Sequence, residues 1–235
     1  MFNGSKLRQR RIKPNIKHYT HPIPRNYMIL EVCTSNFKSA IAALEGGAHR
    51  IELCENLIEG GTTPSLGMIR AVKKRLNLPV FVLIRPRGGN FCYTPDEFAI
   101  MQEDLHICRE EGVEGVVFGA LLPNGTIDTL ACQGLLEAAK GMETTFHRAF
   151  DEVPNMEEAI EILVSLGFSR ILTSGQKDTA LAGVPNLAQL VRVARGRIGI
   201  LPGGGISPEN AVEILQKTGV KELHASLRRT ITTPT

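Results

Sequence analysis

The chain has 235 residues, of which 43% are hydrophobic and 22% charged, a composition typical of a globular protein with a large core. Its apolar runs have the length of a strand, far below the ~20 residues of a membrane-spanning helix, and this argues against a membrane protein. Residues 1–27 hold seven of the 27 Lys and Arg residues and none of the 24 acidic ones. The rest of the chain is therefore mildly acidic, which argues against nucleic acid as the main partner.

We interpret residues 1–27 as a basic, disordered leader, because they lack the apolar segment of a secretory signal and contain three prolines. A transit peptide or a nuclear localisation patch is the alternative. The chain has five cysteines, an odd number, and no two of them have Cys-x-x-Cys spacing. We therefore expect reduced thiols in an intracellular compartment.

From residue 28 onward one unit repeats, a short β-branched run followed by a loop and a helix with one apolar face. The predicted strands are 29–33, 50–54, 80–86, 115–121, 144–150, 170–175, 198–205 and 222–226. N-cap residues followed by proline at Thr63, Thr94 and Ser207 indicate helix starts between them. Eight such units predict one (β/α)8 TIM barrel over residues 28–235, with an open doubly wound sheet as the alternative.

The end of the chain departs from this pattern. Nine residues follow Ser226, too few and too β-branched for the helix that closes a barrel after its eighth strand. We therefore expect a barrel without this closing helix, whose exposed apolar edge either lowers the stability of the fold or favours association.

Polar side chains are predicted to point into the barrel at its mouth, because side chains alternate along each strand and the apolar positions between them pack on helices. The resulting catalytic candidates are Glu31, Glu52, Arg85, His147, Asp151 and His224. Glu31 or Glu52 would act as a base and His147 as an acid or base, while Arg85, Arg87 and Arg148 would hold an anionic substrate. Asp151 would orient one of these cations or bind a metal. A self-paired Glu–Arg network that only fills the barrel is the alternative.

Glycine and hydroxyl residues follow the last three strands, where barrels often bind phosphate. Glycines let backbone N–H groups approach an anion, and the start of the next helix adds positive potential. The predicted anion site consists of Ser174, Gly203, Gly204, Gly205, Ser226 and Arg228. It suits a small anionic or phosphorylated metabolite, although such glycines can also serve only the turns.

Cys33 and Cys54 end the first two strands, each in a Glu-x-Cys step. Neighbouring strands lie about 4.8 Å apart, and two metal–sulfur bonds of about 2.3 Å in line span about 4.6 Å. The two thiolates would therefore hold one metal ion. Two soft thiolate ligands that need no imidazole ligand beside them favour monovalent copper over zinc. Buried cysteines that act only as small apolar residues are the alternative.

Nine segments in order resemble the CutC family of copper homeostasis proteins: EVC, RIELC, EGGTTPS, VFVLIRPRGG, VVFGAL, TFHRAFD, ILTSG, PGGGI and ELHAS. The resemblance covers residues 28 to about 229. It implies a cytoplasmic, sometimes nuclear, TIM barrel that is commonly a homo-oligomer, with Cu(I) bound by Cys33 and Cys54 and no established catalytic activity. Asn90 stands where the family usually has Asp, and the usual segment after Arg229 is missing.

Copper homeostasis through Cu(I) is thus the first hypothesis. An enzyme acting on a small anionic metabolite is the second, and a structural or oligomeric scaffold is the third.

Overall fold

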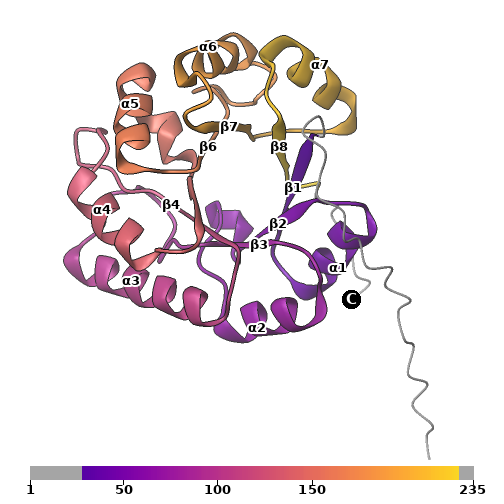
Figure 1. Cartoon of the computed structure of the whole chain (residues 1–235), viewed down its shortest axis with the longest axis vertical. Helices are drawn as coiled ribbons and strands as arrows, with labels where there is room; N and C mark the ends of the chain where they lie inside the picture. The colour runs from indigo at the N-terminus through magenta and orange to yellow at the C-terminus, as the bar shows by residue number, and fades with distance from the viewer. Residues whose placement is uncertain (1–27, 228–235) are drawn as a thin grey trace, which may run out of the picture.

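The computed structural model describes residues 28–227, which form a ring of parallel strands surrounded by helices (Figure 1). The strands are β1 Ile29–Thr34, β2 Arg50–Leu53, β3 Val80–Leu83, β4 Gly115–Phe118, β5 Glu143–Phe146, β6 Arg170–Thr173, β7 Gly199–Pro202 and β8 Glu222–Ala225. The helices are α1 Phe37–Glu45, α2 Leu66–Arg75, α3 Pro95–Glu110, α4 Thr129–Ala138, α5 Met156–Leu166, α6 Val184–Ala194 and α7 Pro208–Thr218, with short 3₁₀ helices η1 Leu57–Glu59 and η2 Arg148–Glu152. The predicted TIM barrel is confirmed.

Each strand from β1 to β6 pairs in parallel with the next along the chain, and β1 also pairs with β8. The register places Cys33 beside Glu52 and Glu31 beside both Arg50 and His224. Within residues 28–227 no hydrogen-bonded ladder joins β7 to β8, although these two strands lie side by side. The barrel is therefore nearly closed, and the carboxyl ends of its strands share one mouth.

The alternation of side chains along the strands separates two cores. Outward residues such as Val32 and Leu53 pack with the helices in the large core, whereas Cys33 belongs to a smaller cluster inside the barrel. The inner cluster consists of Cys33, Cys54, Phe81, Leu83 and Val117. Gly115 makes room for this cluster, since a Cβ atom there would lie 2.6 Å from the Phe81 ring. The predicted inward direction of the Glu-x-Cys steps is thus confirmed.

Several strands end earlier than predicted. The strand predicted to span 144–150 stops at Phe146, because the chain turns at His147, whose side chain accepts a hydrogen bond from the Ala149 N–H and begins η2. The strand predicted over 198–205 likewise stops at Pro202. The residues beyond these ends line the mouth as loops, which is where barrel sites are built.

The helix starts follow the expected capping chemistry, with one correction. Thr94 and Glu97 form a capping box around Pro95, and Ser207 caps α7 in the same way. The start predicted at Thr63 is wrong, because Ser65 caps α2, and the Thr63 hydroxyl instead accepts a hydrogen bond from the Arg85 N–H. This hydrogen bond ties the loop after β2 to the end of β3.

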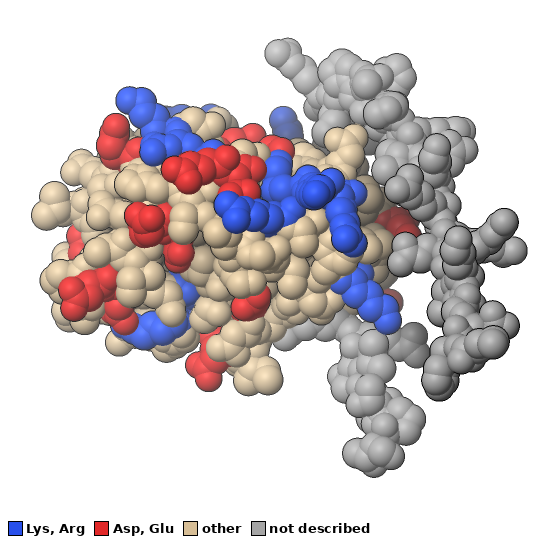
Figure 2. All heavy atoms as spheres, turned by 90° about the horizontal axis from the view of Figure 1, so that it is seen from below, with Lys and Arg blue, Asp and Glu red and all other residues tan. Residues whose placement is uncertain are grey.

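Two of the predictions lie outside the described residues, namely the leader 1–27 and the missing helix after β8, since only Ser226 and Leu227 follow that strand in residues 28–227. No helix in the described part of the chain is long and apolar enough to cross a membrane. Acidic and basic side chains are interspersed on the face seen in Figure 2.

Candidate functional site

Two thiols meet at the mouth of the barrel. Cys33 lies near the end of β1 and Cys54 directly after β2, and their Sγ atoms are 3.5 Å apart. Both side chains are buried and neither forms a disulfide. The Cys54 thiol also lies 3.6 Å from the backbone oxygen of Thr34. The parallel register of β1 and β2 therefore places the two predicted metal ligands in direct contact.

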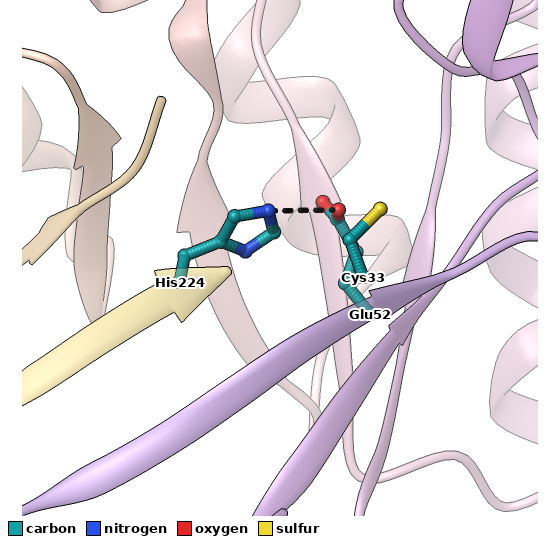
Figure 3. A group of neighbouring side chains, drawn as sticks. All are labelled: Cys33, Glu52 and His224. Atoms are coloured by element: carbon teal, nitrogen blue, oxygen red, sulfur yellow. Dashed lines mark ion pairs between the residues drawn. The ribbon is translucent and has the colours of Figure 1, made fainter. Parts of the chain in front are cut away.

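An imidazole and a carboxylate lie beside this pair. One ligand atom each from Cys33, Glu52 and His224 lies within 4.8 Å of the other two. Figure 3 shows the His224 ring reaching from β8 toward Glu52 and Cys33 on the neighbouring strands, and its Nε2 atom is 3.7 Å from Glu52 Oε2. The sequence predicts His224 as an acid–base candidate and requires no imidazole near the thiols. The structure adds His224 to their surroundings.

The charges of this group are strongly coupled. Burial alone would raise the pKa of Glu31, but the hydrogen bond with His224 and the charge of Arg50 lower it to about 2. Burial opposes a charged His224, yet Glu52, Cys33 and Glu31 raise the pKa of His224 well above its ordinary value. Burial also raises the pKa of Glu52, although the charge of His224 opposes this. His224 is therefore an imidazolium that pairs with the Glu31 carboxylate 2.7 Å away.

The Cys33 thiol is protonated in the metal-free protein. Its hydrogen bond with Cys54, its burial and the charge of Glu52 all raise the pKa of Cys33. A metal ion binds the thiolate form, so binding would displace a proton from this site.

An ionic cluster that the sequence analysis missed lies below this site. Arg50 pairs with Glu31 and Glu222, and Arg170 pairs with Glu143 and Glu222. Both guanidinium groups lie 4.9 Å from the centre of the Phe81 ring. The same alternation that turned Glu52 and His224 inward predicts inward positions for Arg50 and Glu222, two residues earlier in each strand. A paired network therefore does fill the barrel, and among the catalytic candidates it includes Glu31 and His224, which pair with each other.

A cavity of about 340 Å³ opens above the thiols. Its walls are formed by Cys33, Glu52, Cys54, Leu57, Gly60, Leu83, Arg85, Phe91, His147, Arg148, Leu172, Asp178, Gly204, Gly205, His224 and Ser226. Arg85 and His147 are buried in these walls. The cavity therefore brings together four of the six catalytic candidates and both thiols.

Asp151 supports the wall of the cavity from behind, whereas Arg87 lies away from it. The Asp151 carboxylate accepts hydrogen bonds from Thr173, from the backbone and hydroxyl of Ser174 and from the backbone of Gln176, and it forms an ion pair with Arg148. Asp151 thus orients the Arg148 cation, which is one of the two roles predicted for it. Arg87 instead pairs with Glu97 and is not among the residues of the cavity wall.

The predicted anion site is only partly assembled around the cavity. Gly204, Gly205 and Ser226 line it. The Ser174 hydroxyl is buried in contacts with Asp151, Arg148 and the backbone of Lys177, so it does not face the cavity. Gly203 packs against Leu172 and His224, where a Cβ atom would lie 2.6 Å from Leu172. Arg228 lies outside the described residues.

Comparisons with known proteins place this geometry in a family. The CutC family matches residues 28–229. The chain is 46% identical to the human copper homeostasis protein cutC homolog, over 87% of this chain and 75% of the human one. It is 48% identical to a CutC family protein of Bacteroides fragilis, over 88% of this chain and 82% of that one.

A solved structure agrees with this likeness. The crystal structure of a CutC protein from Streptococcus agalactiae superposes with a TM-score of 0.82 at 39% identity, covering 85% of this chain and 98% of that one. The family resemblance of the motifs is therefore confirmed over the whole barrel. The chain belongs to the CutC family.

Proposed function

We propose that this protein acts in copper homeostasis by binding one Cu(I) ion between Cys33 and Cys54. The observation that carries the proposal is the 3.5 Å contact between their buried Sγ atoms. Two metal–sulfur bonds of about 2.3 Å span about 4.6 Å in line, so the sulfur atoms need to separate by only about 1 Å. A change of this size is within reach of small side-chain rotations.

The surroundings of the thiols favour a monovalent ion. Two thiolates are soft ligands, which suit Cu(I), and a copper dithiolate carries one net negative charge. The His224 imidazolium lies beside Cys33 and compensates that charge. The copper homeostasis proteins of the same family support the same choice of metal.

Competition with a chromophoric Cu(I) chelator under anaerobic, reducing conditions tests this proposal. We expect one Cu(I) per chain in the wild type and an affinity at least about 100-fold lower in Cys33→Ser and in Cys54→Ser, since each substitution removes one of two ligands. Cys132→Ser is the matched control, because Cys132 is buried on α4 instead of at the mouth. Stoichiometric, high-affinity binding in the Cys33→Ser/Cys54→Ser double variant would overturn the proposal.

We further infer a cytoplasmic protein, with a share in the nucleus, that assembles as a homo-oligomer. Free thiols at all five cysteines suit a reducing compartment. Light scattering of the purified full chain tests the assembly, and fractionation of cells that express the full chain tests the location. A monomer contradicts the inferred assembly, and a protein found only in a secreted fraction contradicts the inferred location.

A further inference from the structure

Arg85 is a buried cation without an anionic partner in residues 28–227. Its side chain is inside the cavity wall, and the residue is 6% exposed. Its guanidinium donates hydrogen bonds to the backbone oxygens of Glu59, Gly61 and Gly89 at 2.7 to 2.9 Å. None of the ion pairs among the described residues includes it, and its Nε atom has no hydrogen-bond partner there. Buried charges are normally paired, so this guanidinium lacks a counterion.

The neighbours of Arg85 do not supply that charge. The Phe91 ring lies 5.0 Å from the guanidinium and contributes only its π face. Tyr93 is a further neighbour, and burial raises the pKa of Tyr93 to about 12, so its hydroxyl remains neutral. The positive charge of Arg85 therefore acts on whatever occupies the cavity.

His147 adds a second donor to the same wall. Its Nδ1 atom accepts a hydrogen bond from the Ala149 N–H at 3.3 Å, which places the ring proton on Nε2. Burial and the charge of Arg85 lower the pKa of His147 to about 3, so the ring is neutral. The Nε2 atom is buried and has no partner among the described residues. Arg85 and His147 both line the cavity, and each has one buried nitrogen without a partner among the described residues. A cation beside a neutral N–H donor fits a negatively charged oxygen acceptor.

The loop after β7 faces the same space with further donors. Gly204 and Gly205 line the cavity with φ angles of +100° and +74°. Their backbone N–H groups have no hydrogen-bond partner within residues 28–227. The Arg148 guanidinium lies against this turn, with its Nη1 atom 3.7 Å from the position of a Cβ at Gly204. Unpaired backbone donors next to an arginine favour an anion here as well.

We propose that this cavity is a binding site for a small oxyanion, a carboxylate or phosphate group of a metabolite, held by Arg85 and His147. A volume of about 340 Å³ suits a small metabolite. Gly204, Gly205 and Arg148 contact the rest of the ligand or a second anionic group. Because the cavity also opens onto Cys33 and Cys54, the bound anion lies next to the proposed copper site. The proposal does not require copper, since its donors are different residues.

Titration of the reduced, metal-free full chain with inorganic phosphate or with malonate, at constant ionic strength and pH 7, tests this site. The side-chain N–H signals of Arg85 and His147 in ¹H–¹⁵N spectra should shift in a saturable manner. Arg85→Gln should weaken binding about tenfold or more, because it removes a charge-assisted donor. Arg87→Gln is the matched control and should leave binding unchanged, since Arg87 pairs with Glu97 instead of lining the cavity.

A second variant covers the case in which Arg85→Gln fails to fold. His147→Asn keeps a side-chain oxygen for the Ala149 N–H but removes the Nε2 donor, and it should also weaken binding about tenfold. Tighter binding of phosphate supports a phosphorylated ligand, and tighter binding of malonate supports a carboxylate. No saturable shift with either anion, or wild-type affinity in both Arg85→Gln and His147→Asn, would overturn the proposal. The Cys33→Ser/Cys54→Ser variant should retain anion binding, so this proposal and the copper proposal fail separately.

Discussion

Replacing Arg50 with methionine tests whether the ionic cluster below the mouth is a structural requirement of the barrel. The Arg50 side chain is 6% exposed and pairs with Glu31, which is 1% exposed, and with Glu222 at 2.6 Å. Arg50→Met keeps an unbranched chain against the Phe81 ring but leaves Glu31 with His224 alone. Removing one partner of a buried ion pair costs about 3–5 kcal/mol. We therefore expect the free energy of unfolding to fall by about that amount.

Denaturant unfolding at pH 7, followed by circular dichroism, measures this loss. Lys217→Met is the matched control, because its pair with Glu213 on α7 is 60% and 47% exposed and contributes at most about 0.5 kcal/mol. The double variant Arg50→Met/Glu31→Gln should recover part of the loss, since it no longer buries an unpaired carboxylate. A loss below about 1 kcal/mol in Arg50→Met would refute the argument that Arg50 neutralises a buried charge.

Three further predictions concern acid stability, thiol reactivity and backbone packing. The pKa of Glu31 lies at about 2 in the folded chain, below its ordinary 4.5, so its carboxylate stabilises the fold above pH 4.5 and this stability is lost as the pH falls through about 2. Unfolding midpoints measured from pH 5 to pH 2 should therefore fall more steeply in the wild type than in Glu31→Gln, and parallel curves contradict this. Iodoacetamide at pH 8 should modify the half-buried Cys92 before Cys132, because burial raises the pKa of Cys132 to about 12; equal rates by mass spectrometry refute it. Gly183→Ala should lower the free energy of unfolding by about 1–3 kcal/mol or more, since its Cβ would lie 1.8 Å from a backbone oxygen. Gly134 lies within α4, and a Cβ atom there would be 3.5 Å from its nearest neighbour. Gly134→Ala should therefore raise the free energy of unfolding by about 0.5–1 kcal/mol. Equal effects of the two substitutions contradict this reasoning.

The periodicity of the sequence was enough to predict much of the fold and part of the site. Strand residues alternate between the helices and the barrel interior, so outward Val32 and Leu53 predict inward Cys33 and Cys54. The strand order follows because consecutive βα units pair in parallel, and this order brings the two Glu-x-Cys steps together. These inferences succeeded because they depend on local geometry, which the identity of each residue and its neighbours controls.

The predicted ends of the strands were less accurate for a physical reason. A strand ends where its ladder partner ends, and the sequence does not show the partner. Phe146 is the last paired residue of β5, although Phe150 further along the chain is also a residue that favours strands. At the turn after Phe146 the Ala149 N–H donates a hydrogen bond to the His147 imidazole, and only the folded backbone brings these two groups within reach.

By itself, the sequence determined the barrel, its inward-facing polar residues and the adjacency of Cys33 and Cys54, because these properties follow from the repeat length and the alternation of side chains. Only the tertiary structure decided how the charges are distributed among them. Glu31 is neutralised by Arg50 and His224, whereas Arg85 has no anionic partner in residues 28–227. Pairing of this kind depends on distances of a few ångströms between residues far apart in the chain. It separates a filled barrel floor from an open mouth that is lined by Arg85 and the two thiols.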